Sequence, residues 1–178
     1  MRKVLFIFGE LSDSDVEWMS DTGQVRNLQA GEPLIEAGRP VSDLSLVLRG
    51  ELSVTAGGRE IARLDEGEIV GELSFLDARP PYASVLAAAA SVVLSVPHAA
   101  IHARFARDPG FAARFYRSLG IFLASRLRQT VGQLGVLDSD DRLAEEETSI
   151  DEIDPEVLDR SALAGHRFER LRARVGIS

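Results

Sequence analysis

Hydrophobic and polar positions change their period twice along the chain. Between residues 24 and 96, short segments alternate with period two and are separated by glycines, as in β-strands joined by turns. The segments 44–48 and 52–55 alternate in this way, and Gly57-Gly58 supplies the positive φ angles for a two-residue hairpin into residues 59–64. Many short strands at this spacing favour a small β-barrel or jelly roll over an α/β sheet.

Helical periodicity flanks this strand region on both sides. Ser12, as an N-cap, predicts a short helix near 12–20, on which we expect Trp18 to anchor against the roll. Two more helices are predicted over residues 98–107 and 111–134. The longer one carries a broad apolar stripe of Phe111, Phe115, Leu119, Phe122, Leu123, Leu127, Val131 and Leu134. A stripe of this width predicts packing on the roll, and it leaves open whether the helix also forms a homodimer or packs only within its own chain.

An acidic segment separates this helix from the end of the chain. Between Asp138 and Asp154, nine acidic residues stand against one arginine, so the segment alone carries the formal net charge of −8. Such a segment repels nucleic-acid phosphates, and we therefore expect no DNA binding. We divide the chain into a domain over 1–135, an acidic linker over 136–154 and a terminal helix over 155–178.

The terminal helix has a clear start and two kinds of side chain. Asp154-Pro155-Glu156 fits an N-cap and first turn, and apolar residues follow at helical spacing. Its arginines are Arg160, Arg167, Arg170, Arg172 and Arg174. Because acidic residues alternate with them, a solvated face is favoured. Whether the helix folds back, docks on a partner or stays frayed is left open.

Composition is typical of a soluble globular protein, with 45% hydrophobic and 27% charged residues. The longest apolar run, residues 85–90, is too short to cross a bilayer, and the N-terminus lacks the apolar length and cleavage site of a signal peptide. The absence of cysteine fits a reducing compartment. We therefore expect a cytoplasmic protein that does not associate with membranes.

Turn glycines recur in a characteristic order along the strand region. They lie in Ala30-Gly31-Glu32, Ala37-Gly38, the turn at Gly50, the turn at Gly67 and the motif Gly71-Glu72-Leu73-Ser74. This order, over residues 11–133, resembles the cyclic-nucleotide-binding domain of bacterial catabolite activators, protein kinase regulatory subunits and gated channels. The resemblance implies a mainly β fold, a β-roll or jelly roll with flanking helices, whose long C-terminal helix serves as lid and dimer seam. It also implies cyclic AMP or cyclic GMP as the ligand.

The resemblance further implies a phosphate-binding turn at Gly71–Ser74. In the family, helix amides face the cyclic phosphate, and the glutamate at the position of Glu72 accepts from the ribose 2′-hydroxyl. An arginine then neutralises the phosphate, but this chain has Pro81 at that position, and Pro80 and Pro81 both lack a backbone N–H. Arg79, two residues earlier, is the only cation in this stretch.

The candidate ligand-binding residues are Gly71, Glu72, Leu73, Ser74, Arg79, Tyr82, Ala83 and Ser84. Three outcomes stay open: nucleotide binding as in the family, an altered anion site that uses Arg79 and the helix amides, and no nucleotide at all. Glu72 either binds ribose, caps its own helix or pairs with Arg79. Tyr82 either fills the space of the missing phosphate contact, stacks on another ligand or packs against its loop, and we favour the last.

Two functions compete at this point. The first is a non-enzymatic regulatory module that binds a cyclic nucleotide or a related anion weakly and signals to a partner protein. The second is a degenerate domain that binds no nucleotide and acts as a structural or interaction module. We expect no metal enzyme of the cupin type, because all three histidines follow the strand region, and His98 and His102 are interpreted as a solvated pair.

Overall fold

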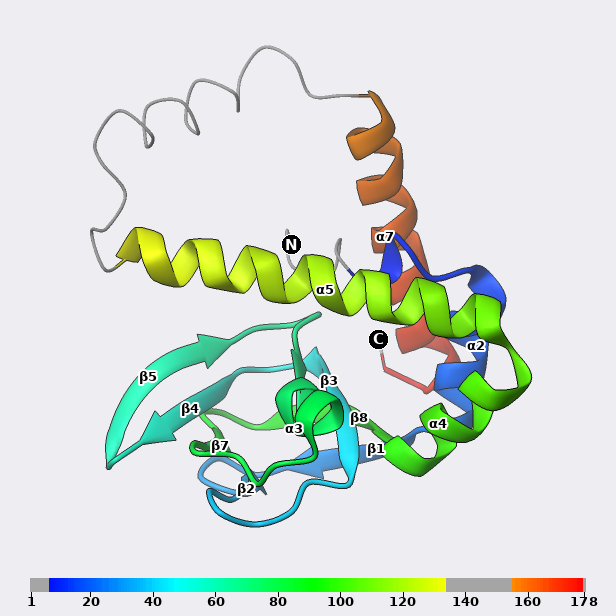
Figure 1. Ribbon diagram of the computed structural model, residues 1–178. Coiled ribbons are helices and arrows are strands. Elements are labelled where there is room, and N and C mark those ends of the chain that lie inside the picture. Colours follow the sequence, from blue (N-terminus) through cyan, green and yellow to red (C-terminus); the bar gives the residue numbers. More distant parts are fainter. Residues whose placement is uncertain (1–6, 134–154, 178) are drawn as a thin grey trace.

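The computed structural model describes residues 7–133 and 155–177, and the strands within them form a roll of two antiparallel sheets (Figure 1). One sheet has the strand order β1-β8-β3-β6, and the other has the order β2-β7-β4-β5. The strands are β1 (Gln24–Leu28), β2 (Pro33–Ile35), β3 (Asp43–Arg49), β4 (Leu52–Ala56), β5 (Arg59–Leu64), β6 (Ile69–Val70), β7 (Ser84–Ala87) and β8 (Ser91–Pro97). The mainly β roll expected from the alternating segments is confirmed, and Gly57-Gly58 joins β4 to β5.

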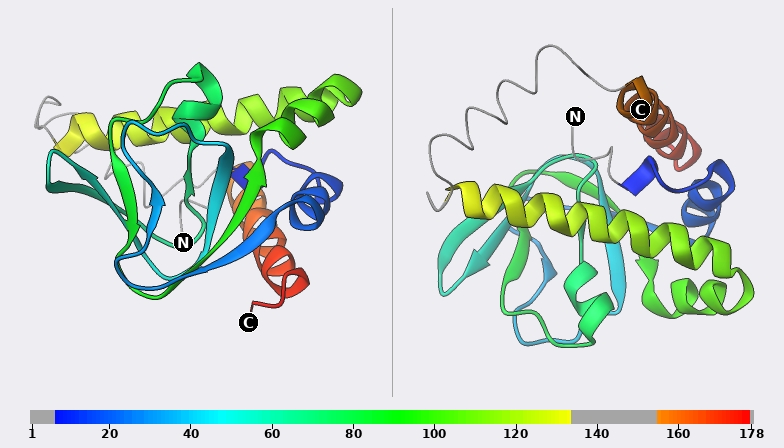
Figure 2. Two further views of the ribbon diagram at one scale, coloured as in Figure 1. Left: turned by 90° about the horizontal axis from the view of Figure 1, so that it is seen from below. Right: turned by 45° about the horizontal axis from the view of Figure 1, so that its top comes forward.

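Helices cover this roll on one side and at one end. They are α2 (Asp13–Thr22), α3 (Glu72–Asp77), α4 (His98–Arg107), α5 (Pro109–Gln133) and α7 (Pro155–Arg174). Helix α5 runs along the roll from beside α4 to above the β4–β5 hairpin (Figures 1 and 2). Helix α4 ends at Arg107 and α5 begins at Pro109. The residue between them, Asp108, caps the start of α5, because its side chain accepts the N–H of Phe111 at 2.8 Å. The expected helix end at Leu134 and the expected acidic linker over 136–154 lie outside the described residues.

Two apolar cores share the strands β3 and β8. Val47 and Val93 point into the roll, toward a cluster that includes Leu52 and Val85. Alternate residues of the same strands point the other way, into a larger cluster with the helices that contains Leu44, Leu46, Leu48, Leu94 and Val96. Both faces of β3 are therefore buried, and its Ser45 hydroxyl shares a hydrogen bond of 2.9 Å with Ser95.

Helix α2 is attached to the other helices through the buried carboxylate of Asp15. Ser12 and Asp15 form a capping box, and the Asp15 side chain is 0% exposed. Arg104 of α4 donates to it at 2.6 Å, and Arg114 of α5 donates at 2.8 Å. Burial alone would raise the pKa of Asp15, but the hydrogen bonds from Arg114 and Ser12 hold it below its ordinary value. Three helices thus meet at one charged group.

Trp18 packs against the larger core, as expected, and it also contacts two other helices. Its ring is half-buried and lies 5.4 Å from the ring of Phe111, measured between centroids. The guanidinium of Arg104 lies over both rings, 4.6 Å from Trp18 and 4.0 Å from Phe111. Trp18 therefore stabilises the contact between α2 and α5.

The terminal helix α7 folds back onto α2 (Figure 2). Its residues Ala164, Phe168 and Leu171 are buried in the larger core. The expectation of a solvated arginine face was wrong for Arg167 and Arg172, whose side chains are only 12% and 14% exposed and pair with acidic residues outside α7. Arg170 and Arg174 are about half exposed, and the side chain of Arg160 lies outside the described residues. No helix of the described residues is long and apolar enough to cross a membrane.

We predict that Asp15→Asn lowers the free energy of unfolding by about 3 kcal/mol, because it leaves two arginines without their buried counter-charge. Urea denaturation measures the loss. Asp21→Asn serves as the control, since its pair with Arg174 is about half exposed and should be worth under about 1 kcal/mol. Equal losses for the two variants would contradict the central role of Asp15.

Candidate functional site

The segment that the sequence singled out begins with a tight turn against β3. Gly71 has a φ of 92° and caps the N-terminus of α3. A Cβ at this position would lie 2.5 Å from the carbonyl oxygen of Asp43. Glycine is therefore required twice, for the left-handed backbone and for the close approach of α3 to β3.

Glu72 follows as the first residue of α3 and is buried, with 3% of its surface exposed. Arg126 of α5 donates from Nη1 to its Oε1 at 2.5 Å. Burial raises the pKa of Glu72, and the charge of Arg126 opposes that rise. Glu72 thus pairs with the long helix, and the expected alternative of a pair with Arg79 was wrong.

A second buried carboxylate faces the same guanidinium. Glu68 is 2% exposed, and its Oε1 lies 3.9 Å from Nη2 of Arg126. Its Oε2 accepts the N–H of Asp65 at 2.7 Å. The guanidinium also lies 4.9 Å from the ring centroid of Phe122. Two buried carboxylates therefore approach one arginine, and we call these residues (Glu68, Glu72 and Arg126) the α3–α5 cluster.

The other candidate residues at this turn are largely exposed. Leu73 is 61% exposed and Tyr82 is 88% exposed, and Arg79 also lies at the surface. The expectation that Tyr82 packs against its loop was wrong, and its phenol does not fill the space of a phosphate contact either. Ser74 is buried at 8% exposure, and its carbonyl accepts the N–H of Ala78.

The loop after α3 is fastened to the turn at Gly38. The carbonyl of Pro81 accepts the N–H of Gly38 at 2.8 Å, and the Ser84 hydroxyl accepts the N–H of Ala37 at 3.0 Å. Ala83 lies between these two contacts and is half-buried. The polar groups at 81 and 84 are therefore engaged in holding the loop's path.

Arg126 is the residue that the sequence prediction missed. It lies 54 residues after Glu72, inside a helix whose apolar stripe predicted only packing. It follows Phe122 by one helical turn, on the face that packs on the roll. An arginine that interrupts an apolar helix face is a signal for a buried acidic partner, although it does not say which acid.

His98 and His102 of α4 support α3 through Phe75. The Phe75 ring is stacked on His102 at 4.8 Å and forms a T-shaped contact with His98 at 5.1 Å, measured between centroids. His98 is half-buried, so the interpretation as a solvated pair was wrong for this residue, and burial lowers its pKa. Within residues 7–133 and 155–177, no group of three or more acidic, histidine or cysteine side chains could hold a metal ion.

Comparison with known proteins shows which family this part of the chain resembles. Residues 25–108 match the family model described as the cyclic nucleotide-binding domain. These residues form a cyclic nucleotide-binding domain. Two curated relatives are similar at the sequence level: a protein described as a potassium channel of Rhodopseudomonas palustris, 27% identical over 61% of this chain, and a cGMP-dependent protein kinase of Toxoplasma gondii, 28% identical over 50%. The matched parts span only 27% and 9% of those proteins.

Solved structures agree with the family match. The catabolite activator protein of Thermus thermophilus is 25% identical, with a TM-score of 0.61 over 94% of this chain and 85% of its own. The N-terminal domain of a transcriptional regulator of Streptomyces coelicolor is 26% identical, with a TM-score of 0.58 over 78% of this chain and 99% of its own. A cyclic nucleotide-binding domain of Methylobacillus flagellatus, 22% identical, shares the fold with a TM-score of 0.66 over 86% of each chain.

We predict that Gly71→Ala destabilises the cyclic nucleotide-binding domain by more than about 3 kcal/mol, since it adds a clash with the Asp43 carbonyl to the left-handed strain. Gly58→Ala is the matched control, because Gly58 also has a positive φ, of 77°, but a Cβ there would meet nothing within 4 Å. It should cost only about 1–2 kcal/mol. Thermal unfolding of both variants measures the difference, and a Gly71 variant no less stable than the Gly58 variant would refute the close approach.

Proposed function

We propose that this chain is a non-enzymatic regulatory module that senses cyclic AMP, cyclic GMP or a related anionic ligand through its cyclic nucleotide-binding domain. The observation that carries the proposal is the buried pair of Glu72 and Arg126, because it connects the candidate ligand-binding turn to the long helix α5. The ligand-binding roles of the residues below belong to this proposal.

The ligand is proposed to bind where α3 and α5 approach each other. Glu72 accepts from the sugar hydroxyl, and the first-turn amides of Leu73 and Ser74 have no acceptor within α3, whose first internal bond is made by Phe75. The loop after this turn has Pro81 where the family has its arginine, and Arg79 is exposed. Arg126 is therefore the cation that is positioned to neutralise a phosphate, and it approaches from α5 instead of from the loop.

Affinity in this arrangement is expected to be low. Arg126 already pairs with the buried carboxylate of Glu72, so an incoming anion competes with that carboxylate for the guanidinium. Any weakening of this pair leaves a buried carboxylate less well compensated, which has an electrostatic cost. This argument agrees with a weak ligand-binding site.

The same competition gives the module its signal. In the empty site Arg126 is held by Glu72, whereas in the occupied site it also contacts the anion, so the position of α5 depends on occupancy. Ligand then shifts the population of α5 positions through contacts that differ between the two states. We propose that a partner protein, and not DNA, reads this change, and a cytoplasmic location remains our prediction.

A second candidate function has its own supporting observation. Glu72 and Ser84 both have polar partners within the chain, and Tyr82 is directed to solvent. These facts also fit a domain that binds no nucleotide and acts through its helices as an interaction module. Ligand titration separates the two candidates.

We predict that calorimetric titration with cyclic AMP and cyclic GMP detects weak binding of at least one nucleotide. Arg126→Ala should reduce the affinity about 10- to 100-fold, because a charge-assisted hydrogen bond contributes about 1.5–3 kcal/mol. Arg79→Ala is the control, and its affinity should stay within about threefold of the wild type because Arg79 is exposed.

Absence of heat for both nucleotides at high concentrations of folded protein would favour the second candidate. A large loss with Arg79→Ala and none with Arg126→Ala would retain a ligand site but overturn the role of the lid helix. Far-UV circular dichroism on each variant confirms that the fold is intact.

Helix α5 also supports the proposal of a homodimer. Tyr116, Leu123 and Leu127 recur at helical spacing on one stripe, and Tyr116 and Leu127 are 46% and 65% exposed. Gly120 lies on the same stripe, and a Cβ there would meet nothing within 4 Å, so another helix can approach closely at this point. The exposed stripe is therefore suited to contact with the same helix of a second copy.

We predict a mass near twice 19.4 kDa by light scattering for the wild type and near 19.4 kDa for Leu127→Glu. In a dimer, Leu127→Glu would bury a carboxylate without a cation between the two copies of α5, which is unfavourable. Arg128→Glu is the control, because it alters a neighbouring exposed position outside the stripe and should remain dimeric. A monomeric wild type at all concentrations would exclude this dimer.

A further inference from the structure

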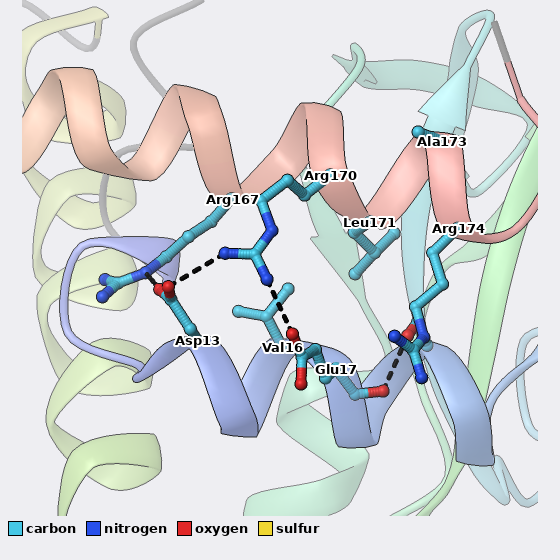
Figure 3. A pocket seen from close by; sticks show the side chains of 9 residues that line it. Asp13, Val16, Glu17, Arg167, Arg170, Leu171, Ala173 and Arg174 are labelled. Carbon is cyan, nitrogen blue, oxygen red and sulfur yellow. Dashed lines mark hydrogen bonds and ion pairs between the residues drawn. The ribbon is translucent and has the colours of Figure 1, made fainter.

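Helices α2 and α7 lie side by side and run in the same direction, joined by a row of ion pairs (Figure 3). On α2 the acids are spaced by one helical turn, and on α7 the arginines are spaced to match them. The pairs are Arg167 with Asp13 at 2.6 Å, Arg170 with Asp13 at 2.9 Å and with Glu17 at 2.6 Å, and Arg174 with Asp21 at 2.8 Å. The register of the two helices is thus set by charge.

Beneath this row the contact is apolar. Phe168 is 5% exposed, and its ring lies 5.9 Å from the ring of Phe8, measured between centroids. Leu171 is 1% exposed and lines a pocket between the helices together with Val16 of α2. Arg167 also donates to the carbonyl of Phe8 at 2.8 Å. The surface under α7 therefore has an apolar floor with an acidic edge.

Arg172 extends the contact to the roll. Its Nη1 lies 3.3 Å from Glu66, in the turn between β5 and β6. That turn also carries Glu68, which faces Arg126 in the site described above. The receiving surface for α7 is thus formed by α2, the segment around Phe8, and Glu66, and we call it the α2 surface.

We propose that the α2 surface is a docking site for a basic amphipathic helix, and that α7 is its occupant within the chain, which a partner helix of the same chemistry displaces. Such a partner carries arginines at positions i, i+3 and i+7 beside an apolar stripe, as α7 does at 167, 170 and 174. Charge complementarity specifies this partner, because the three acids on one face of α2 would repel an acidic helix and would form no ion pairs with a neutral one.

The charged edge of the contact has the properties of an exchangeable one. The paired side chains of Asp13, Glu17, Asp21, Arg170 and Arg174 are between 44% and 57% exposed, so these ion pairs are individually weak and are screened by salt. Residues 134–154 join α5 to α7, and a chain of that length can reach about 70 Å when extended. The covalent connection therefore does not oblige α7 to remain on the α2 surface when a competitor occupies it.

Tethering nevertheless favours α7 over a partner. A docking segment on the same chain acts at an effective concentration on the order of millimolar. A partner helix has to exceed that advantage, or the α7 contact has to be weakened first. The wild-type chain should accordingly bind such a helix poorly, and a chain with a weakened α7 should bind it well.

The test uses a fluorescent peptide of residues 155–178 as the probe and the full chain as the receptor. Arg170→Glu/Arg174→Glu weakens the internal contact at two half-exposed positions, and fluorescence anisotropy should show at least about tenfold tighter binding of the peptide than by the wild type. Adding Asp13→Arg/Glu17→Arg to that variant should abolish binding. A matched peptide in which the same two arginines are glutamate should not bind to the Arg170→Glu/Arg174→Glu chain.

Hydrogen exchange over residues 162–175 reports independently whether α7 is docked. The proposal expects faster exchange there in Arg170→Glu/Arg174→Glu while the exchange of β3 and β8 is unchanged, which also shows that the variant is folded. It is overturned if α7 becomes unprotected but the peptide does not bind, or if both peptides bind equally. Unchanged protection of α7 in this variant would equally refute a docking site governed by these charges.

Discussion

The buried ion pair between Glu72 and Arg126 is the interaction on which the candidate site and the long helix both depend. A carboxylate with 3% of its surface exposed has lost most of its hydration, and that cost is offset only by a close cation and by hydrogen bonds. Arg126, at 2.5 Å, meets this need. Because one partner belongs to α3 and the other to α5, neither the turn at Gly71 nor the second half of α5 can change without affecting the other.

A second ion pair between an arginine and a buried carboxylate holds the N-terminal part of α5. Arg114 binds Asp15 of α2, so α5 is fixed at two points, to α2 at one end and to α3 at the other. Helix α2 in turn carries the acids that receive α7. The carboxylates of Asp13, Asp15, Glu17 and Asp21 on α2 and of Glu72 on α3 are thus paired with arginines on α4, α5 and α7, and these ion pairs connect the helices to one another. A displacement of α2 or of α3 therefore acts on α5, because Arg114 and Arg126, which bind those two helices, both belong to α5.

The sequence predicts the features that depend on local conformation, and it misses those that depend on distant partners. The Gly57-Gly58 hairpin, the Ser12 helix start and the bounds of α4 follow from backbone preferences within a few residues, and all three were predicted. Gly71 and Glu72 were found through motif order. The partner of Glu72 is 54 residues away and the partners of Arg167 are more than 150 residues away, and no local pattern encodes such pairings. Tyr82 was misplaced for a related reason, since the path of its loop is decided by the hydrogen bond between Pro81 and Gly38.

The two groups of ion pairs differ in burial, and this difference decides what each can respond to. The pair at Glu72 is largely shielded from salt, so ions in solution hardly affect it, and only a group that enters the site and contacts Arg126 directly changes its energy. The pairs between α2 and α7 are half exposed and are screened by salt, so a competing charged surface changes their energy without entering a cavity. Asp15 lies between the two groups, buried and bound by arginines of α4 and α5. The helical layer therefore combines a buried ion pair, which changes only when a group enters the site, with half-exposed ion pairs, which a charged surface can reach from outside. Helices α2 and α5, joined through Asp15 and Arg114, are the elements through which each group of pairs can influence the other.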